Sequence, residues 1–553
     1  MIEIFNRLRS NPRLFAQIIL ASFLVNILAL ATPIYVIQVL QRYVAYGVTS
    51  TLITLVAGII FVSIFEFFFR NIRHRMAREL EPLNAVLADR VMKKLVSIKT
   101  TYYAVQKQFR PDVVSGHLNT IQNNLGATTA LILIDVPFVS IFLIALFLIH
   151  WQLGLIVSVF IFVPFIIVSF YKTTINNLSN TSYQNVIATT RMHDNIISRY
   201  ETVRYFNLVE GVKQAWAKLV NQIISTKENF EANKNVLNSF MAFSATFLTI
   251  IVIGWGSVLS VDGAVSVGAL IGANILAGRA IAPIIRYIQI IEPLSKTENS
   301  LKEINSFLNL PHEPEGGTEI KEFKGTIKIK DLYFKYPQSK NPIFEGLDCE
   351  MGAGNLIAIS GSNGSGKTTL IKTLAGILEF QRGNVFFDSI EINQLSLEWL
   401  RKNLIYVPQE PKFVDGSLLD NLIGLKEIQK QKMDEILKKV DLNDFVNSDP
   451  KGIRMLLSDR GENLPFGIRK RIALARALVT DGQIVILDEP TETLDQKGKS
   501  AIYNLITEFI KLKKTIVIST LDNEILNKAN YIIDIDSKPT PQITKNKIKF
   551  NYK

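Results

Sequence analysis

The sequence has 553 residues, of which 48% are hydrophobic and 20% charged, with a mean hydropathy of +0.22. Such a chain is too long for one ordinary domain and too apolar for a wholly soluble protein, so at least two domains are expected, one of them in lipid. The net charge of +12 does not indicate a nucleic-acid partner, because the basic residues gather beside apolar stretches rather than on a face with aromatic stacking residues.

Six apolar stretches are each long enough to cross a bilayer as a helix. The first is longer than the core of a signal peptide and lacks an evident cleavage site, so it is interpreted as a membrane span. An even number of spans places both ends of the chain on the same side of the membrane. The predicted spans are residues 14–40, 51–69, 129–149, 153–171, 237–260 and 265–291.

The loops between these spans are of two kinds. Short loops such as HWQLG and SVDGAVS carry almost no Lys or Arg, whereas the long segments 70–126 and 172–235 contain both. Basic loops favour the cytoplasm, so both long segments are predicted there. Their helical apolar spacing predicts that they continue the membrane helices as shafts of roughly 40 Å.

Small and ionisable residues mark the predicted spans. Gly268 and Gly272 have the small-xxx-small spacing that lets helices approach closely, which favours packing over a role in substrate contact. Ionisable groups in or beside a span need a partner or water, so they serve either as interfacial anchors or as substrate contacts. These groups are Glu66, Asp135, Arg279 and Arg286.

After residue 291 the composition changes, and Pro and Gly residues mark a linker. The sequence therefore predicts a membrane domain over residues 1–300, a linker over 301–324 and a soluble domain over 325–553. The only cysteine, Cys349, excludes an intramolecular disulfide and a cysteine-based metal cluster within one chain.

A phosphate-binding loop follows the apolar strand predicted at 356–360. The sequence GSNGSGKT lies between this strand and a predicted helix, which is the context such a loop requires. Its glycines let backbone N–H groups surround the β-phosphate, Lys367 reaches the β- and γ-phosphates, and Thr368 ligates Mg²⁺. The predicted ATP-binding residues here are Gly361, Ser362, Asn363, Gly364, Ser365, Gly366, Lys367, Thr368 and Thr369.

A second apolar strand, in QIVILDEP, ends in two acids. A buried strand delivers such residues to the sheet edge where the phosphates lie. Asp488 suits Mg²⁺ binding through water, and Glu489 suits a general base. The alternative, that the two acids only cap the next turn, is less favoured because the phosphate-binding loop is in the same domain.

Six spans followed by these motifs, by FKYP, YVPQEP and LDEPTETLD, resemble an ATP-binding-cassette (ABC) exporter half-transporter. The resemblance implies an α-helical six-span membrane domain followed by an α/β P-loop NTPase domain, working as a dimer with ATP and Mg²⁺. It implies that Tyr336 stacks on adenine, although Tyr336 as a structural edge-strand aromatic remains an alternative. It also implies that Gln409 senses Mg²⁺ as a metal-site residue and that Asp495 contacts the second subunit.

The membrane segments LALATPIYVIQVLQRYVAYGVTSTL, LIDVPFVSIFLIALFLIH and GALIGANILAGRAIAPI are similar to the type I secretion branch, which exports unfolded polypeptides. This resemblance implies a multi-pass protein of the bacterial inner membrane with a cytoplasmic nucleotide-binding domain, a periplasmic adaptor and an outer-membrane channel. With a first span near residue 14, the chain is expected to lack the N-terminal peptidase-like domain of some relatives. Export of lipids or small molecules by a homodimer stays an alternative.

Two motifs depart from the family pattern. The family's Leu-Ser-Gly-Gly-Gln, which presents its Ser and glycine amides to ATP on the opposite subunit, is replaced by Leu464-Pro-Phe-Gly-Ile468. Proline is a good first residue of a helix but lacks an N–H, so the helix can form while its phosphate contacts weaken. At the position of the family's switch histidine stands Thr520, and no histidine follows His312.

These departures lead to a hypothesis about turnover. The signature and the histidine serve opposite sites of a dimer, so a homodimer has both defects in both sites, and an intact partner leaves one defect in each. We therefore expect ATP binding with hydrolysis that is slow or depends on a partner subunit. The alternatives are that other groups replace the lost contacts, or that the chain is a non-hydrolysing partner of another half-transporter.

Overall fold

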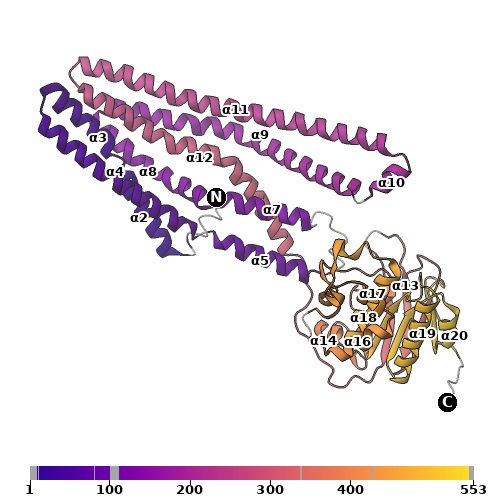
Figure 1. The fold of residues 1–553 in the computed structure, drawn as a ribbon. Coiled ribbons are helices and arrows are strands. Elements are labelled where there is room, and N and C mark those ends of the chain that lie inside the picture. Colours follow the sequence, from indigo (N-terminus) through magenta and orange to yellow (C-terminus); the bar gives the residue numbers. More distant parts are fainter. Residues whose placement is uncertain are drawn as a thin grey trace. The chain divides into compact units, whose positions relative to one another are not determined.

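The computed structural model describes residues 9, 11–79, 81–99, 111–197, 199–336, 339–424 and 427–546, apart from some side chains between 82 and 194. The chain divides into two compact units (Figure 1). The first is helical and ends at Leu310; the second begins at Pro311 and includes Ile98 and Lys99. The division falls inside the predicted linker 301–324.

The first unit is built from long helices, three of which greatly exceed the thickness of a bilayer. Helices α9, α11 and α12 have 47, 53 and 42 residues, so they extend over about 60–80 Å, roughly twice a hydrocarbon core. The helices are α2 (Pro12–Leu28), α3 (Ala31–Gln38), α4 (Thr49–Arg78), α5 (Pro82–Ser97), α7 (Pro111–Asn124), α8 (Ala127–Ile149), α9 (Trp151–Ile197), α10 (Tyr200–Tyr205), α11 (Val209–Val261) and α12 (Val267–Leu308). The helical shafts predicted for 172–235 are present in α9 and α11.

Five stretches among the described residues are long and apolar enough to cross a membrane. They are Pro12–Val44, which contains α2 and α3, and helices α4, α8, α11 and α12. The fourth predicted span, 153–171, lies on α9, where Trp151–Pro164 forms a shorter apolar stretch and most side chains beyond it lie outside the described residues. Six spans therefore stay a prediction, with five found.

Helix α12 is longer than the sequence pattern indicates. The composition changes after residue 291, but the helix continues through Pro293 to Leu308. The carbonyl of Pro293 accepts bonds from Thr297 Oγ1 at 2.8 Å and Asn124 Nδ2 at 3.3 Å. Residues buried at helical spacing, among them Leu294 and Phe307, hold the continuation, so packing overrides the helix-breaking signal.

The two glycines of α12 allow a close approach to α3. A Cβ on Gly268 would lie 3.0 Å from the carbonyl oxygen of Ile37, and one on Gly272 would lie 2.4 Å from Ile37 Cγ1. Distances this short leave no room for a side chain unless neighbouring atoms of α3 shift. The geometry thus favours the packing role expected for these glycines.

A buried ion pair joins α4 to α8. Arg73 Nη1 and Asp135 Oδ1 are 2.5 Å apart, and their side chains are only 8% and 16% exposed. The guanidinium also reaches Ser22 Oγ on α2 at 3.4 Å. Asp135 therefore has the partner that an acid within a span needs. Arg73 lies in a segment predicted as a basic cytoplasmic loop, but its side chain forms a buried ion pair.

The second unit contains two sheets. The smaller is antiparallel, in the order β2-β1-β4-β5, and the larger is mainly parallel, in the order β12-β11-β3-β10-β9-β6. The strands are β1 (Ile327–Phe334), β2 (Phe344–Met351), β3 (Leu356–Ser360), β4 (Arg382–Phe387), β5 (Ile390–Glu391), β6 (Leu404–Val407), β9 (Ile484–Asp488), β10 (Thr515–Ser519), β11 (Tyr531–Asp534) and β12 (Gln542–Lys545). A short pair, β7 (Gly416–Ser417) with β8 (Leu456–Leu457), is separate.

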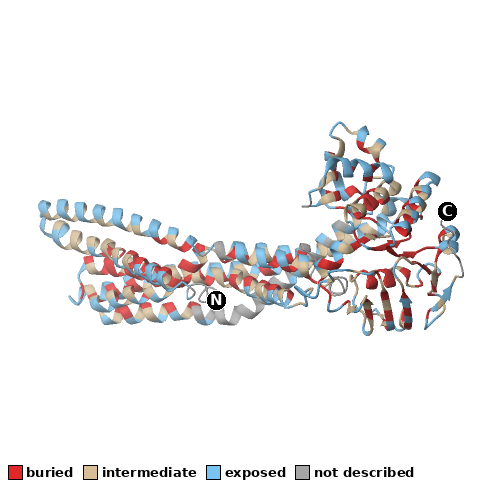
Figure 2. Cartoon of the chain, turned by 90° about the horizontal axis from the view of Figure 1, so that it is seen from below, coloured by how far each residue is buried: buried red, intermediate tan, exposed pale blue. Residues whose placement is uncertain are grey.

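The larger sheet is covered on both faces, and buried residues concentrate on its strands (Figure 2). Alternate residues of β3 belong to two different cores: Ile357 packs with the antiparallel sheet, and Leu356 packs with the helices on the other face. Strands buried on both faces are continuously apolar, as the sequence shows. The helices are α13 (Lys367–Leu374), α14 (Leu397–Asn403), α15 (Leu418–Ile423), α16 (Lys430–Lys439), α17 (Asn443–Ser448), α18 (Phe466–Val479), α19 (Gln496–Lys511) and α20 (Asn523–Lys528).

The buried pair of the helical unit gives a stability prediction. Replacing Asp135 with Leu leaves Arg73 buried without its acid, which should cost about 3–5 kcal/mol. The double variant Arg73→Met/Asp135→Leu should recover most of this loss, because neither charge is then buried. Thermal unfolding of the purified protein in detergent measures both effects.

Glu66→Gln is the control, because it removes the Arg70–Glu66 pair, in which Arg70 is half exposed, and should cost under about 1 kcal/mol. An Asp135→Leu variant as stable as this control would contradict the prediction.

Candidate functional site

The phosphate-binding loop connects the end of β3 to the start of α13, as predicted. Gly366 has φ +115°, and a Cβ added to it would lie 2.2 Å from Ile343 Cγ2. Gly364 has φ +82°, a conformation that a side chain also disfavours. Both positions therefore need glycine, one for space and conformation and the other for conformation alone.

Lys367, the first residue of α13, lies inside this loop and is only 5% exposed. Its Nζ donates to the carbonyl oxygens of Gly361 at 2.8 Å and Ser362 at 3.2 Å. It also forms an ion pair with Glu489 Oε1 at 3.1 Å. The lysine thus links the loop to the acid at the end of β9.

The two acids follow one another at the end of β9 but have different surroundings. Asp488 is 0% exposed, and its Oδ1 accepts a hydrogen bond from Ser519 Oγ on the neighbouring strand β10. Its buried Oδ2 has no hydrogen-bond partner among the described residues, and neither has the buried Oγ of Ser365 in the loop. Oxygen ligands with unused lone pairs fit Mg²⁺ or its bound water.

Glu489 lies in a left-handed backbone conformation, with φ +44°. Its N–H donates to Ser519 Oγ at 2.9 Å, and its Oε2 accepts from Gln409 Nε2 at 3.1 Å. Gln409 Nε2 lies at the same distance from Glu492 Oε2. Burial, together with a hydrogen bond shared with Glu492, raises the pKa of Glu489, while Lys367 opposes that shift.

Tyr336 lies beside the same loop. Its hydroxyl is 3.1 Å from Thr369 Oγ1, and its ring meets Phe334 edge-on, with the centroids 4.9 Å apart. The residue is 40% exposed, so one side of the ring is accessible. The position suits stacking on a base as well as the structural alternative.

The segment from Leu464 to Ile468, predicted to be an altered signature, lies at the start of α18. Pro465 precedes the helix, and the ring of Phe466 lies 5.2 Å from the guanidinium carbon of Arg469 and 5.5 Å from Lys470 Nζ. Ile468 packs against the helical core. The tip thus forms a helix start, as expected, with an aromatic ring and an apolar side chain where the family pattern has glycine and glutamine.

Thr520 and Asp495 both make contacts within the chain. Thr520 is 2% exposed, its N–H donates to Ile359 O at 3.0 Å, and its Oγ1 accepts from the N–H of Asp522 at 3.0 Å. Asp495 caps α19 by accepting from Gly498 N at 2.8 Å and pairs with Arg471 at 3.2 Å. The Asp495 side chain is 64% exposed, which leaves it accessible to a second subunit.

The comparisons with known proteins agree with this geometry. The family model described as ABC transporter matches residues 344–492, and the model of the ABC transporter transmembrane region matches residues 15–283. The chain is an ABC exporter half-transporter. Its second unit is an ABC ATPase domain, so the predicted order of a helical membrane domain followed by an ATPase domain, and the predicted ATPase activity, are confirmed.

Two relatives and one solved structure resemble this half-transporter over most of its length. The alpha-hemolysin translocation ATP-binding protein HlyB of Escherichia coli O157:H7 is 25% identical, covering 95% of this chain and 75% of HlyB. The leukotoxin translocation ATP-binding protein LktB of Mannheimia haemolytica is 24% identical, covering 94% and 74%. A bacterial Atm1-family ABC exporter with ATP bound shares the fold, with a TM-score of 0.83 and 19% identity over 97% of this chain and 95% of that one.

Three residues that contact the site of the half-transporter were not predicted from the sequence. Asp536 accepts from Ser362 N at 2.7 Å and Ser362 Oγ at 2.8 Å, which holds the start of the phosphate loop. Glu492 shares Gln409 with Glu489, and Lys470 donates to the carbonyl of Glu489. Lys470 and Glu492 stand next to recognised motifs, but nothing in the sequence places Asp536 beside a loop 174 residues away.

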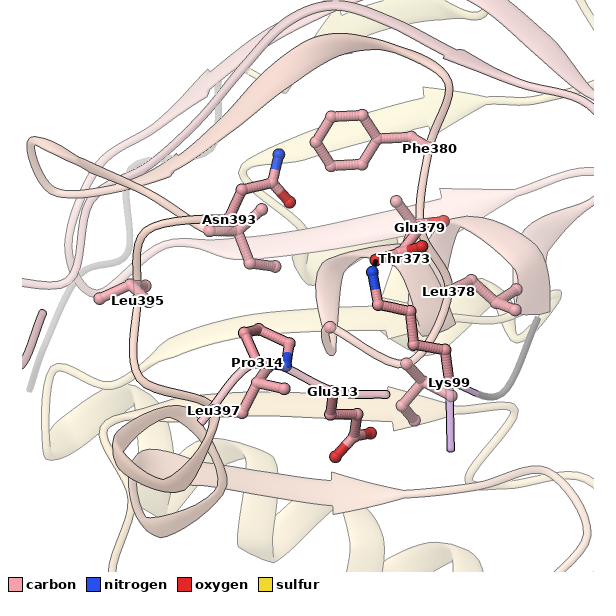
Figure 3. Close-up of a pocket in the computed structure, with 13 residues that line it drawn as sticks. Lys99, Glu313, Pro314, Thr373, Leu378, Glu379, Phe380, Asn393, Leu395 and Leu397 are labelled. Atoms are coloured by element: carbon pink, nitrogen blue, oxygen red, sulfur yellow. Dashed lines mark hydrogen bonds and ion pairs between the residues drawn. The ribbon is translucent and has the colours of Figure 1, made fainter. Parts of the chain in front are cut away.

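A separate pocket of about 430 Å³ lies elsewhere on the ATPase unit (Figure 3). Lys99 and Glu379 form an ion pair at 2.5 Å in its wall, beside Asn393 and Thr373. None of the predicted nucleotide-binding residues lines it. The pocket is therefore distinct from the site formed by the phosphate loop and the acids.

Lys367→Ala should abolish Mg-ATP binding by the purified half-transporter. The substitution removes the ammonium group that the loop holds for the phosphates and leaves Glu489 without its ion-pair partner. A fluorescent ATP analogue, titrated against the protein in nanodiscs, measures the affinity. Lys372→Ala, on the last turn of the same helix, is the matched control and should bind normally; equal affinities of the two variants would contradict the assignment.

Glu489 and Glu492, which both accept a hydrogen bond from Gln409, predict how ATP hydrolysis depends on pH. A general base acts only when it is ionised. Because the pKa of Glu489 is raised, its carboxylate becomes protonated at a higher pH than an ordinary glutamate, and hydrolysis should be lost below that higher pH. Glu492→Gln removes one cause of the raised pKa and should move this acid limb to lower pH.

The pH profile of phosphate release, corrected for the Glu489→Gln variant, measures the shift. Glu462→Gln, an exposed acid near the signature, should leave the midpoint unchanged. An unmoved midpoint in Glu492→Gln would show that Glu492 does not tune the base.

Proposed function

We propose that this half-transporter is an ATP-driven export subunit of type I secretion character, which moves polypeptide across the inner membrane of a bacterium. The observation that carries the proposal is the similarity, over 94–95% of this chain, to relatives named for the translocation of alpha-hemolysin and of leukotoxin. The same likeness supports a periplasmic adaptor and an outer-membrane channel as partners. The cytoplasmic side would hold the ATPase unit.

The proposed site binds ATP between two subunits. In each subunit the loop from Gly361 to Thr369 and Lys367 hold the phosphates, Tyr336 stacks on adenine, and Asp488, Thr368 and Gln409 serve the metal site. Mg²⁺, when bound, neutralises charge on the phosphates. Glu489 accepts a proton from the attacking water. Two bound ATP molecules would favour the state in which the ATPase units are together, and so bias the helices toward an outward-facing state.

The proposed hydrolysis is slow or depends on a partner. Two groups that would contact the phosphates are replaced, since Pro465 has no N–H and Thr520 has no imidazole. A lost donor to a developing charge costs about 10²-fold or more in rate. At both replaced positions the side chain makes a contact within its own chain. The Phe466 ring packs over Arg469, and Thr520 Oγ1 accepts a hydrogen bond from the N–H of Asp522.

A second function is favoured by the same replacements. A subunit that binds ATP without hydrolysing it would complete or regulate another half-transporter, which would supply an intact signature and histidine. A neighbouring reading frame separates the two: an adaptor gene alone supports the secretion subunit, and a second half-transporter with LSGGQ and the histidine supports the partner subunit. Export of lipids or small molecules by a homodimer is a third reading with the same fold.

ATP hydrolysis by the chain alone in nanodiscs tests the proposal. We expect turnover well below about 1 per second, a low value for an enzyme, together with clear Mg-ATP binding. Restoring the missing groups by Pro465→Ser, Phe466→Gly, Ile468→Gln and Thr520→His in one chain should raise turnover at least about tenfold.

Glu489→Gln sets the background, and Thr520→Gln with the same three signature changes controls for altered packing. Wild-type turnover at or above about 1 per second that disappears in Glu489→Gln would refute impaired hydrolysis and favour a self-sufficient homodimer.

A further inference from the structure

A buried lysine on helix α18 contacts the backbone of the site described above, but no role has yet been given to it. Lys470 is 0% exposed and lies one turn after Phe466 at the signature tip. Its Nζ donates to the backbone carbonyl of Glu489 and, at 3.3 Å, to that of Glu492. A buried ammonium group is costly unless hydrogen bonds and opposite charge compensate it, so these two bonds account for its presence there.

The two carbonyls belong to a strained turn. Glu489 has φ +44° and Thr493 has φ +63°, a conformation that only glycine adopts readily. Such a backbone persists where its surroundings impose it. The turn also bends on itself, because Glu492 N donates to Glu489 O at 3.3 Å. Lys470 therefore bonds to both ends of the segment that sets the direction of the Glu489 side chain.

The surroundings of the amine keep it in place. Burial lowers the pKa of Lys470, and the nearby carboxylates of Glu492, Glu489 and Asp488 oppose that shift. The Phe466 ring lies 5.5 Å from Nζ and covers it on the side of the signature tip. The amine thus lies between an aromatic ring and a set of acids, with its donors directed to the turn.

We propose that Lys470 is a positioning residue for ATP hydrolysis, because its two hydrogen bonds hold the turn from Glu489 to Glu492 so that the Glu489 carboxylate faces Lys367 and the phosphate loop. Helix α18 then has two roles. Its tip faces outward, toward the nucleotide that a second subunit would hold, and its buried side supports the base of its own subunit. This role goes beyond the proposed function, because it depends neither on the cargo nor on how fast the site turns over.

The test compares Lys470→Met and Lys470→Gln in the full chain in nanodiscs. Methionine has a similar length but no donor, whereas glutamine keeps N–H donors without the charge. Lys514→Met is the matched control, because Lys514 is also buried and its Nζ donates to a backbone carbonyl, that of Gly482. Lys514 also pairs with Asp481 at 3.3 Å, so the control removes a buried lysine with the same kinds of bonds outside the turn from Glu489 to Glu492.

Two measurements are made on each variant. Hydrogen–deuterium exchange of peptides covering 489–494 and 466–479 reports the turn and helix α18 separately. Single-turnover hydrolysis of bound radioactive ATP reports the rate even where it is slow, with Glu489→Gln as background, and a binding titration gives the ATP affinity.

We expect Lys470→Met to increase exchange in 489–494 only, to lower the single-turnover rate about tenfold or more, and to leave ATP affinity within about twofold. Lys470→Gln should restore most of the protection and of the rate, and Lys514→Met should change neither. If exchange in 489–494 is unchanged in Lys470→Met, the proposal is overturned. It is also overturned if faster exchange spreads over α18, or if Lys514→Met lowers the single-turnover rate as much as Lys470→Met does. If the wild-type rate equals the background, the exchange result alone decides.

Discussion

The hydrogen bonds of Ser519 are the interaction on which the geometry of the site depends. Strand β10 lies between β3 and β9 in the parallel sheet, so its last residue reaches the ends of both neighbours. Ser519 Oγ donates to Asp488 Oδ1 and accepts from Glu489 N, and its carbonyl lies 3.1 Å from the same N–H. One buried hydroxyl thus orients Asp488, the acid proposed for the metal site, and holds Glu489, the proposed base, in its left-handed turn. Because Thr520 follows directly, the position where the resemblance implies a histidine is tied to the same strand end.

The sequence predicted the parts of this site that depend on local chemistry. The loop from Gly361 to Thr368 could be recognised because a strand, glycines and a lysine at a set spacing permit one arrangement around phosphate. Asp488 and Glu489 followed from an apolar strand that ends in acids. Gln409, which the resemblance implied for the metal site, lies beside Glu489. The roles themselves stay predictions, since they concern a bound nucleotide.

The sequence did not predict contacts that depend on how distant elements meet. Asp536 is recognisable as a loop anchor only once β11 is known to pair with β3, which brings its end to the phosphate loop. Arg73 lies in the basic segment 70–126 predicted in the cytoplasm, and its distance of 62 positions from Asp135 hides their pairing. The continuation of α12 beyond Pro293 was hidden for another reason: a proline signals a helix end locally, while burial of Leu294 and Phe307 decides the outcome.

Gly467 shows what the signature tip retains. A Cβ at this position would meet only Leu494 Cδ2, at 3.9 Å, which is ordinary contact, and the residue has a helical backbone with negative φ. Glycine in a helix costs about 1 kcal/mol relative to alanine, so the described chain gains nothing from glycine there. A close approach by the proposed partner subunit would account for it, since only glycine exposes the helix N-terminus without a side chain. The tip would therefore still fit the proposed partner subunit, even though Pro465 and Phe466 would alter what it offers to a nucleotide.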